Sequence, residues 1–314
     1  MNLPASPLLA QRRIAVVAPS GAPLDDAAVL RGLQVLEQLG CEVHNYYRAA
    51  QRFERFAASD AERAAQLHAA AANPDVDIIL ALRGSYGLSR ILPLLDLDML
   101  AASGKLLVGY SDFTPLYQAM LARGRISLAG PMLCDDFTRD EPSAYTLSQF
   151  AAALSAVAAA VPHRVDFASP DSADMAVDGC LWGGNLAMLV HTLGTPYWHE
   201  PQQGILFLED IGEHPYRIER MLLQLHFAGV LARQQAIVLG DFSAYRLVAN
   251  DNGYDFASML AYIRSVCPVP LVCGLPFGHI RERASLVVGS QAQLRVHNGV
   301  ANLSMHFPID QASL

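Results

Sequence analysis

The segment Leu106-Leu107-Val108-Gly109-Tyr110-Ser111-Asp112-Phe113 is a short apolar strand pattern that runs into a small residue, a serine and an aspartate typical of a helix start. A serine at such a strand-to-helix turn projects its hydroxyl at the carboxyl end of a sheet, close to the N–H groups of the following helix. The segment therefore predicts a nucleophile, Ser111, with the backbone N–H of Asp112 placed to help hold an oxyanion. Alternatively, Ser111 and Asp112 simply cap the helix.

Apolar strand patterns and helix patterns alternate through the first half of the chain. Strands are predicted at 14–18, 41–46, 77–82 and 106–110, and helices at 25–39, from 59 onward, at 87–95 and at 112–122. The helix after residue 59 begins with a capping box, in which Ser59 is followed three residues later by Glu62. This βαβα order predicts a parallel sheet with helices on both faces, so the predicted fold class is α/β.

The second half of the chain has a different character, and the change falls within residues 140–160. Beyond it we predict strands at 205–208 and 236–240, helices at 215–227 and 257–266, and a β-hairpin in which Asn298-Gly299 separates two strand patterns. We therefore expect a first domain over residues 1–145, a linker over 146–172, and a smaller, β-rich α+β domain over 173–314.

The composition is that of an ordinary globular protein. At 314 residues and 52% hydrophobic content the chain can bury a substantial core, and its length is consistent with two domains. The formal net charge of −8, without clusters of Lys and Arg, argues against a nucleic-acid partner and favours a small-molecule or peptide substrate. The five cysteines are scattered and include no CxxC pair, which favours reduced thiols over disulfides or a zinc site.

The beginning of the chain contains no pattern for secretion or membrane insertion. Arg12 and Arg13 directly precede the strand pattern at 14–18, and this apolar stretch is too short for the core of a signal peptide or for a membrane helix. We therefore expect a cytoplasmic protein without a membrane partner.

A glycine-rich loop, Arg83-Gly84-Ser85-Tyr86-Gly87, follows a second predicted strand of the sheet. Open α/β sheets place their ligands at the carboxyl ends of such strands, and the glycines allow the backbone to approach a substrate closely. The loop lacks the GxGxxG spacing, so it does not predict a dinucleotide site. Alternatively, it is only a tight turn.

An acid and a base for Ser111 are available in the second half of the chain. Glu209, Asp210 and Glu213 lie at or after the end of a predicted strand, and each is a candidate acid or a solvated loop carboxylate. His279 lies in a constrained turn, Pro276-Phe277-Gly278-His279, which would fix an imidazole as a general base requires.

Two further features complete the set of candidates. The neighbours His199-Glu200 and Glu213-His214 form neither HExxH nor another closely spaced set of metal ligands, so neither a metal nor another cofactor is predicted. The stretch Leu181-Trp182-Gly183-Gly184-Asn185-Leu186 resembles a turn that enters a helix, with Asn185 either in contact with a ligand or capping the helix.

These fragments, in this order, resemble the LD-carboxypeptidase family of serine peptidases, which includes murein tetrapeptide carboxypeptidases and microcin C7 self-immunity peptidases. The resemblance covers nearly the whole chain and rests on Ala18-Pro19-Ser20, Arg83-Gly84-Ser85-Tyr86-Gly87, Gly109-Tyr110-Ser111-Asp112, Gly130-Pro131-Met132, Trp182-Gly183-Gly184-Asn185-Leu186, Leu208-Glu209-Asp210 and Gly278-His279. It implies a Rossmann-like N-terminal domain with the nucleophile and a β-rich C-terminal domain with the acid and the base, facing each other across a groove.

The resemblance also assigns roles to individual residues. It implies Ser111 as nucleophile, Glu209 as orienting acid and His279 as base, with an oxyanion hole formed by backbone amides of Gly84 or Ser85 and of Asp112. The candidate substrate-binding residues are Arg83, Tyr86, Trp182 and Asn185. The chain departs from the common family form at Ser85, where Arg-Gly-Gly-Tyr-Gly is usual.

The expected activity is removal of the terminal D-alanine from a murein tetrapeptide during cell-wall recycling, without a cofactor. Similarity to the family also suggests a homodimer. One alternative is a peptidase of the microcin C7 type that cleaves aminoacyl-nucleotide conjugates, for which Trp182 would offer a stacking surface. Another is a protein that binds small peptides in the same groove without catalysis.

Overall fold

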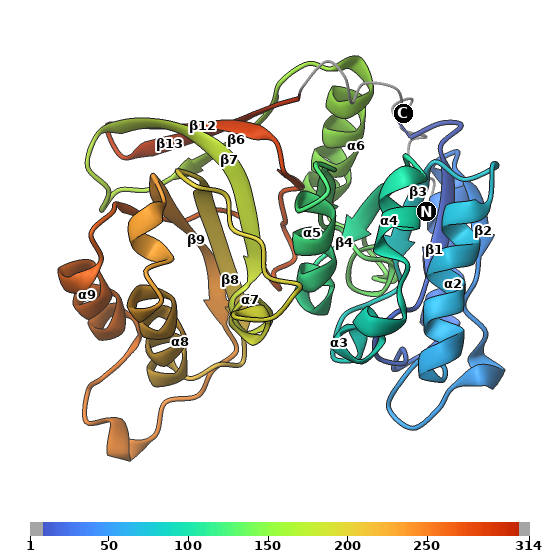
Figure 1. Cartoon of the computed structure of the whole chain (residues 1–314), viewed down its shortest axis with the longest axis horizontal. Helices are drawn as coiled ribbons and strands as arrows, with labels where there is room; N and C mark the ends of the chain where they lie inside the picture. Colours follow the sequence, from blue (N-terminus) through green and yellow to red (C-terminus); the bar gives the residue numbers. More distant parts are fainter. Residues whose placement is uncertain (1–8, 308–314) are drawn as a thin grey trace.

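The computed structural model describes residues 9–307, which form two α/β units lying side by side (Figure 1). The strands are β1 (Arg13–Val17), β2 (Glu42–Asn45), β3 (Ile78–Ala81), β4 (Leu106–Gly109), β5 (Ser127–Ala129), β6 (His163–Ala168), β7 (Met175–Asn185), β8 (Ile205–Ile211), β9 (Ala236–Ser243), β10 (Leu271–Cys273), β11 (Leu286–Val288), β12 (Gln291–His297) and β13 (Val300–His306). The α-helices are α1 (Asp26–Gln38), α2 (Asp60–Ala72), α3 (Leu88–Ile91), α4 (Leu97–Ala102), α5 (Thr114–Leu121), α6 (Ala144–Ala159), α7 (Leu186–Thr192), α8 (Pro215–Phe227) and α9 (Phe256–Val266). Two short helical turns matter for the site, the 3₁₀ turn η3 (Ser111–Phe113) and the π-helical turn η4 (Leu133–Phe137).

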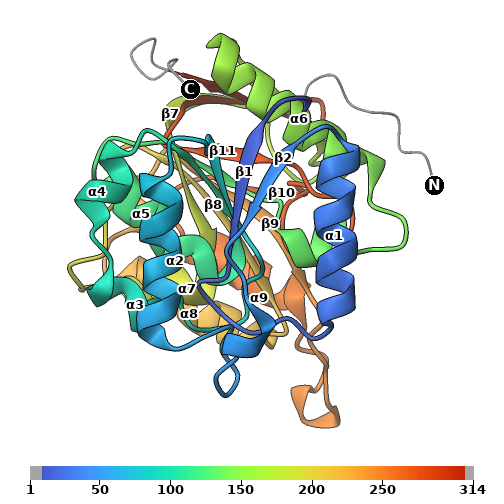
Figure 2. The same ribbon diagram turned by 90° about the vertical axis from the view of Figure 1, so that its right-hand side faces the viewer.

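The N-terminal sheet has the strand order β11-β5-β4-β3-β1-β2. Strands β1 to β5 pair in parallel, whereas β11 runs antiparallel to β5. Helices cover both faces of the sheet, and α1 and α2 lie on opposite sides of β1 and β2 (Figure 2). Because β3 and β4 are adjacent and parallel, the segments that follow them emerge at the same edge of the sheet.

The C-terminal sheet is mixed, with the strand order β10-β9-β8-β7-β12-β13-β6. The long strand β7 joins its two halves: 175–180 pair antiparallel with β12, and 181–185 pair parallel with β8. The parallel half carries α7, α8 and α9, and the antiparallel half contains the predicted hairpin at Asn298-Gly299. The α/β class with a β-rich second domain is therefore confirmed.

The stretch 181–184 differs from its predicted structure, because it belongs to β7 and is not a turn. Its glycines permit close packing: a Cβ on Gly183 would lie 2.0 Å from the carbonyl oxygen of Phe207, and one on Gly184 would lie 2.6 Å from Oγ1 of Thr114. Glycine therefore marks a close approach between elements here, a role it has in strands as well as in turns.

Two strands do not follow the domain division expected from the sequence. The segment 146–172 contains most of α6 and also β6, which pairs with β13 in the C-terminal sheet. Strand β11 lies beyond residue 173, yet it forms the edge of the N-terminal sheet. The chain thus passes between the two units more than once, and the division at 145 and 173 stays a prediction.

Apolar side chains fill two buried clusters. The larger extends through the N-terminal unit and the inner face of the C-terminal sheet, and the smaller lies beneath α7, α8 and α9. Within residues 9–307, the helices are all too short or too polar to cross a membrane. The cysteines, all five of which lie in this range, are free thiols.

Candidate active site

Ser111 lies just beyond the end of β4, at the start of η3, and its backbone is held in the left-handed region with φ of +62°. Gly109 makes the sharp turn possible, because a Cβ there would lie 2.8 Å from the ring of Phe113 and 2.9 Å from Cβ of Ala81. A non-glycine residue in this conformation is strained, and such strain is common where a nucleophile is presented at a strand-to-helix turn.

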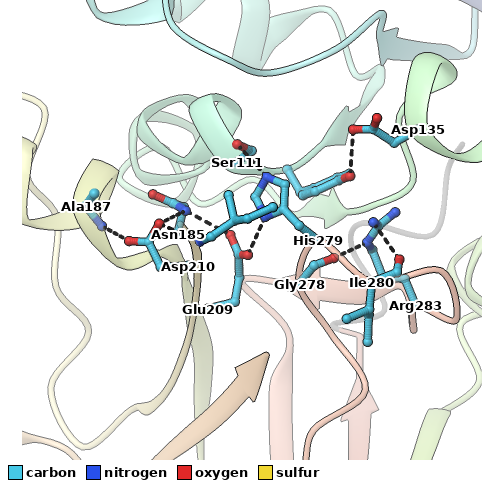
Figure 3. Close-up of polar contacts among 12 residues, drawn as sticks. Ser111, Asp135, Asn185, Ala187, Glu209, Asp210, Gly278, His279, Ile280 and Arg283 are labelled. Atoms are coloured by element: carbon cyan, nitrogen blue, oxygen red, sulfur yellow. Dashed lines mark hydrogen bonds and ion pairs between the residues drawn. The ribbon is translucent and has the colours of Figure 1, made fainter. Parts of the chain in front are cut away.

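The Ser111 hydroxyl begins a continuous chain of polar contacts that connects the two units (Figure 3). Nε2 of His279, in the loop between β10 and β11, lies 3.1 Å from Oγ of Ser111. Nδ1 of the same ring lies 2.8 Å from Oε2 of Glu209, which is fully buried in β8. The side-chain amide of Asn185 donates to the other carboxylate oxygen of Glu209, at 3.1 Å. The imidazole is thus held between a hydroxyl and a carboxylate that is itself fixed.

The three candidate acids occupy different positions. Glu209 contacts the imidazole, as described above. Asp210 points away from it and accepts a hydrogen bond from the backbone N–H of Ala187, at the start of α7, at 2.9 Å. Burial raises the pKa of Asp210 to about 6, and the negative charge of Glu209 adds to the effect. Glu213 lies further along the chain and pairs with Arg217 at 3.6 Å.

The glycine-rich loop lies against Ser111. A Cβ on Gly84 would lie 2.9 Å from Oγ of Ser111 and 3.4 Å from the backbone nitrogen of Asp112, so the loop backbone can come this close only without a side chain. The carboxylate of Asp112 is buried and accepts the N–H of Leu88 at 2.8 Å, which ties the nucleophile turn to the helix after the loop. Burial raises the pKa of Asp112, and the Ser20 hydroxyl opposes this shift. The loop and the turn lie close together, as an oxyanion hole requires, and the role of their amides stays a prediction.

Ser85, where the chain departs from the common family form, has a left-handed backbone with φ of +81°. Its hydroxyl accepts a hydrogen bond from the Arg55 guanidinium at 3.1 Å. A residue with a Cβ therefore adopts the loop conformation that glycine would adopt without strain.

We expect Ser85→Gly to stabilise the protein and to leave turnover nearly unchanged. Relief of the left-handed strain outweighs the extra backbone entropy of glycine in the unfolded chain, giving a net gain in unfolding free energy of about 0.5–1 kcal/mol. The backbone N–H remains, so kcat should stay within about threefold. Denaturant unfolding measures the first effect. Ser89→Gly, on helix α3, is the control and should lower stability instead; a destabilised Ser85→Gly would contradict the strain argument.

Arg83 and Tyr86, two of the predicted substrate-binding residues, belong to the glycine-rich loop, and both are at least partly exposed. Nη1 of Arg83 donates to the backbone carbonyl of Ala22 at 2.8 Å, so this guanidinium is partly committed to the protein. Tyr86 is 41% exposed, and its ring packs beside Phe56 and under the guanidinium of Arg55. Both residues stay candidates for substrate contact.

The structure gives the other two predicted substrate-binding residues different positions. Trp182 is wholly buried, and its indole N–H donates to Oε1 of Gln234 at 2.8 Å. It offers no face to a ligand, so the expectation that it stacks on a substrate is wrong. Asn185 is also buried; it caps α7 by accepting the N–H of Met188 at 3.1 Å, while its amide group holds Glu209. The capping interpretation of Asn185 is correct, and its contact is with the acid.

Sequence reasoning missed Thr114, the first residue of α5. Its hydroxyl donates to the backbone carbonyl of Ser111 at 2.7 Å and accepts the backbone N–H of Asn185 at 3.0 Å. Thr114 therefore joins the nucleophile turn of one unit to the acid-holding residue of the other. A threonine three residues after a predicted nucleophile is a weak signal, because threonine is also common in the first turn of helices for local reasons.

The pKa of His279 determines when it can act as a base. Burial by itself would lower this pKa, but the hydrogen bond and the negative charge of Glu209 outweigh burial, so the pKa lies above the usual value. Asp210 is a second group near the site whose pKa is raised, to about 6.

We expect kcat/KM to fall as the pH drops through the raised pKa of His279, because only the neutral ring can accept a proton. The acid limb of the profile should therefore lie above about pH 6.5, the ordinary histidine value. Initial rates over a pH series measure it. Asp210→Asn separates the two titrations: the limb should persist in that variant, and its disappearance would assign the limb to Asp210 instead.

The fold and the site define a class: a two-domain α/β protein in which a serine, a histidine and a glutamate form one chain of contacts between the two units, as in serine hydrolases. Within residues 9–307, no group of three or more His, Cys, Asp or Glu side chains is placed to hold a metal ion. Family models place the chain more narrowly: 14–130 match the LD-carboxypeptidase N-terminal domain, and 178–294 match the LD-carboxypeptidase C-terminal domain. The chain belongs to the LD-carboxypeptidase family of serine peptidases.

Individual relatives agree with this family. The crystal structure of a muramoyltetrapeptide carboxypeptidase from Oxalobacter formigenes is 47% identical, with a TM-score of 0.88 over 94% of this chain and 99% of that one. The murein tetrapeptide carboxypeptidase of Pseudomonas aeruginosa is 33% identical over 90% of this chain and 92% of its own. The microcin C7 self-immunity protein MccF of Escherichia coli is more distant, at 25% identity over 76% of each chain.

Proposed function

We propose that this protein is a serine LD-carboxypeptidase that removes the terminal D-alanine from murein tetrapeptides in cell-wall recycling. The observation that carries the proposal is the contact chain from Ser111 through His279 to Glu209, with distances of 3.1 Å and 2.8 Å. The choice of substrate rests on similarity to relatives named as murein and muramoyl tetrapeptide carboxypeptidases.

The contacts of Ser111, His279 and Glu209 support the following acylation step. Nε2 of His279 accepts the proton of the Ser111 hydroxyl as Oγ attacks the carbonyl carbon of the amide that precedes D-alanine. Glu209 accepts the Nδ1–H, which fixes the tautomer that leaves Nε2 free and stabilises the imidazolium that forms. Backbone amides of the loop at Gly84 and Ser85 and of Asp112 receive the oxyanion.

The intermediate then collapses, and deacylation repeats the same steps with water. The imidazolium gives its proton to the departing amine, so the C–N bond breaks, D-alanine leaves and the tripeptide remains as an ester on Oγ of Ser111. His279 next takes a proton from a water molecule that attacks the ester. Proton return to Oγ releases the tripeptide and restores the starting state.

The alternatives have less support. A microcin C7-type activity would be favoured by an aromatic side chain free to stack on a nucleobase, and the aromatic considered for this role, Trp182, is fully buried. A purely binding protein has no need for a buried carboxylate aligned on an imidazole that contacts a serine, since burying charged groups costs free energy.

The direct test is hydrolysis of a defined tetrapeptide. We expect the purified protein to release D-alanine from a murein tetrapeptide in the presence of a chelator, as followed by mass spectrometry. A matched peptide that ends in L-alanine should be a poor substrate, and Ser111→Ala should release nothing measurable. Equal release from both peptides would reject LD specificity. No release by the folded protein would reject the proposed function and make an aminoacyl-nucleotide conjugate the next substrate to test.

A further inference from the structure

Arg283 is a buried residue whose side chain donates hydrogen bonds to the backbone on both sides of His279. Only 1% of the side chain is exposed. Nε donates to the carbonyl of Gly278 at 2.5 Å, and Nη2 donates to the carbonyl of Ile280 at 2.9 Å (Figure 3). The residue that precedes the imidazole and the residue that follows it are thus bound by one rigid guanidinium group.

The same guanidinium is anchored to the other unit of the molecule. Nη1 lies 2.5 Å and 2.6 Å from the two carboxylate oxygens of Asp136, which belongs to η4 and is equally buried. Asp136 is fixed in turn, because it accepts the backbone N–H of Met132 at 3.0 Å. The backbone N–H of Arg283 itself donates to Oγ1 of Thr146, on α6, at 2.9 Å.

Arg283 also contacts the residue next to the nucleophile. Its guanidinium carbon lies 4.0 Å from the centre of the Tyr110 ring, and that ring packs edge-on against the imidazole of His279 at 5.1 Å. The Tyr110 hydroxyl donates to Asp135 of η4 at 3.0 Å. Arg283 therefore contacts three parts of the site: the backbone beside His279, the ring of Tyr110 and the η4 turn.

We propose that Arg283 is a positioning residue that fixes the His279 imidazole relative to Ser111, by binding both flanking carbonyls while it is paired with Asp136 in the other unit. The proposal rests on the proposed function, in which His279 is the base. A buried ion pair adds little net stability, since desolvation offsets most of the attraction, so the value of this one lies in the geometry that it imposes. A displacement of about 1 Å at a reacting group can cost about 100-fold in rate.

Geometry and charge can be separated at this site. The groups that face His279 are Glu209 from β8, Arg283 from its own loop, Asp135 from η4 and the Tyr110 ring. Lysine in place of arginine keeps the positive charge near the imidazole, but it cannot hold two carbonyls and a carboxylate with a planar group of fixed shape. Arg283→Lys therefore changes the geometry and leaves the electrostatic environment nearly intact.

The test compares Arg283→Lys and Asp136→Asn with the wild type and with Arg233→Lys. Arg233 is the control, because it also pairs with a carboxylate: its Nε and Nη2 lie 2.6 Å and 2.9 Å from the oxygens of Glu200, in the C-terminal unit away from the site. For each protein we would measure kcat and KM for D-alanine release, thermal unfolding, and the downfield proton resonance of the His279 Nδ1–H. That resonance reports the hydrogen bond to Glu209 without any substrate.

We expect Arg283→Lys to lower kcat about 10- to 100-fold with KM within about twofold, and to broaden the His279 resonance well below the unfolding temperature. Asp136→Asn keeps the side-chain shape and should give a smaller loss of kcat and a weaker broadening of the resonance. This variant tests the proposal if Arg283→Lys does not fold. Arg233→Lys should leave kcat and the resonance unchanged.

One result would overturn this proposal, and another would reject the proposed function while leaving this proposal testable. Lower unfolding temperatures in Arg283→Lys and Asp136→Asn, with an unchanged kcat and a sharp His279 resonance, would mean that the pair only stabilises the fold. If the wild type releases no D-alanine, the proposed function fails, and the resonance in the same variants still decides whether Arg283 fixes the imidazole.

Discussion

Replacing Ser111 by alanine is expected to lower kcat for D-alanine release by about 10⁴- to 10⁶-fold, with little change in KM. The hydroxyl oxygen is the atom that forms the acyl-enzyme in the proposed mechanism, and it lies 3.1 Å from Nε2 of His279. Residual turnover would come from water activated by His279 and from the oxyanion hole. Steady-state kinetics at saturating substrate measure the loss.

Ser265→Ala is a suitable control for this prediction. Ser265 is exposed on α9 and its hydroxyl donates to the carbonyl of Tyr262 at 2.7 Å, so its replacement removes a serine hydroxyl and its hydrogen bond far from the site. This variant should keep wild-type kcat. A Ser111→Ala protein that retains more than about a hundredth of the activity would remove Ser111 from the mechanism.

Glu209→Gln is expected to lower kcat by about 10³- to 10⁴-fold while the fold is retained. The amide has the shape of the carboxylate, but its NH₂ group can donate to Nδ1 of His279. The ring is then held in the tautomer that carries its proton on Nε2, where it cannot accept the proton of Ser111. Loss of the carboxylate also removes the charge that raises the pKa of His279, so the acid limb of the remaining activity should move to lower pH.

Glu200→Gln separates this effect from the general cost of altering a buried glutamate. The side chain of Glu200 is only 7% exposed and pairs with Arg233. Its replacement should lower stability without changing kcat or the acid limb. Retention of kcat within tenfold in Glu209→Gln would show that the imidazole does not depend on this carboxylate.

Much of the fold follows from local sequence patterns. The capping box at Ser59 and Glu62, the Asn298-Gly299 hairpin and the helix Pro215–Phe227 are present where they were predicted. The misread segment was 181–184, because a glycine pair has the same appearance in a turn and in a strand that packs closely on its neighbours. The return of β11 to the first sheet also has no local signature, since it depends on pairing with β5, more than 150 positions earlier.

Some residues of the candidate site were likewise predicted from the sequence, and others were not. Ser111 and His279 follow strands and Glu209 lies within β8. Family resemblance selected the same three residues that the structure brings into contact. Arg283 and Asp136 were not predicted, because they are 147 positions apart and neither lies in a recognisable motif. Trp182 was misplaced because an aromatic residue next to a ligand site and one in the core look alike in sequence.

The route of the chain near its end limits how this protein can be recombined. The loop that carries His279 leaves the C-terminal sheet at β10 and enters the N-terminal sheet as β11, before the chain returns to β12. A chimera that joins the first half of one homologue to the second half of another would import a foreign edge strand together with the foreign histidine. Functional hybrids should therefore require β5 and β11 from the same parent, and the halves are not exchangeable modules despite their separate sheets.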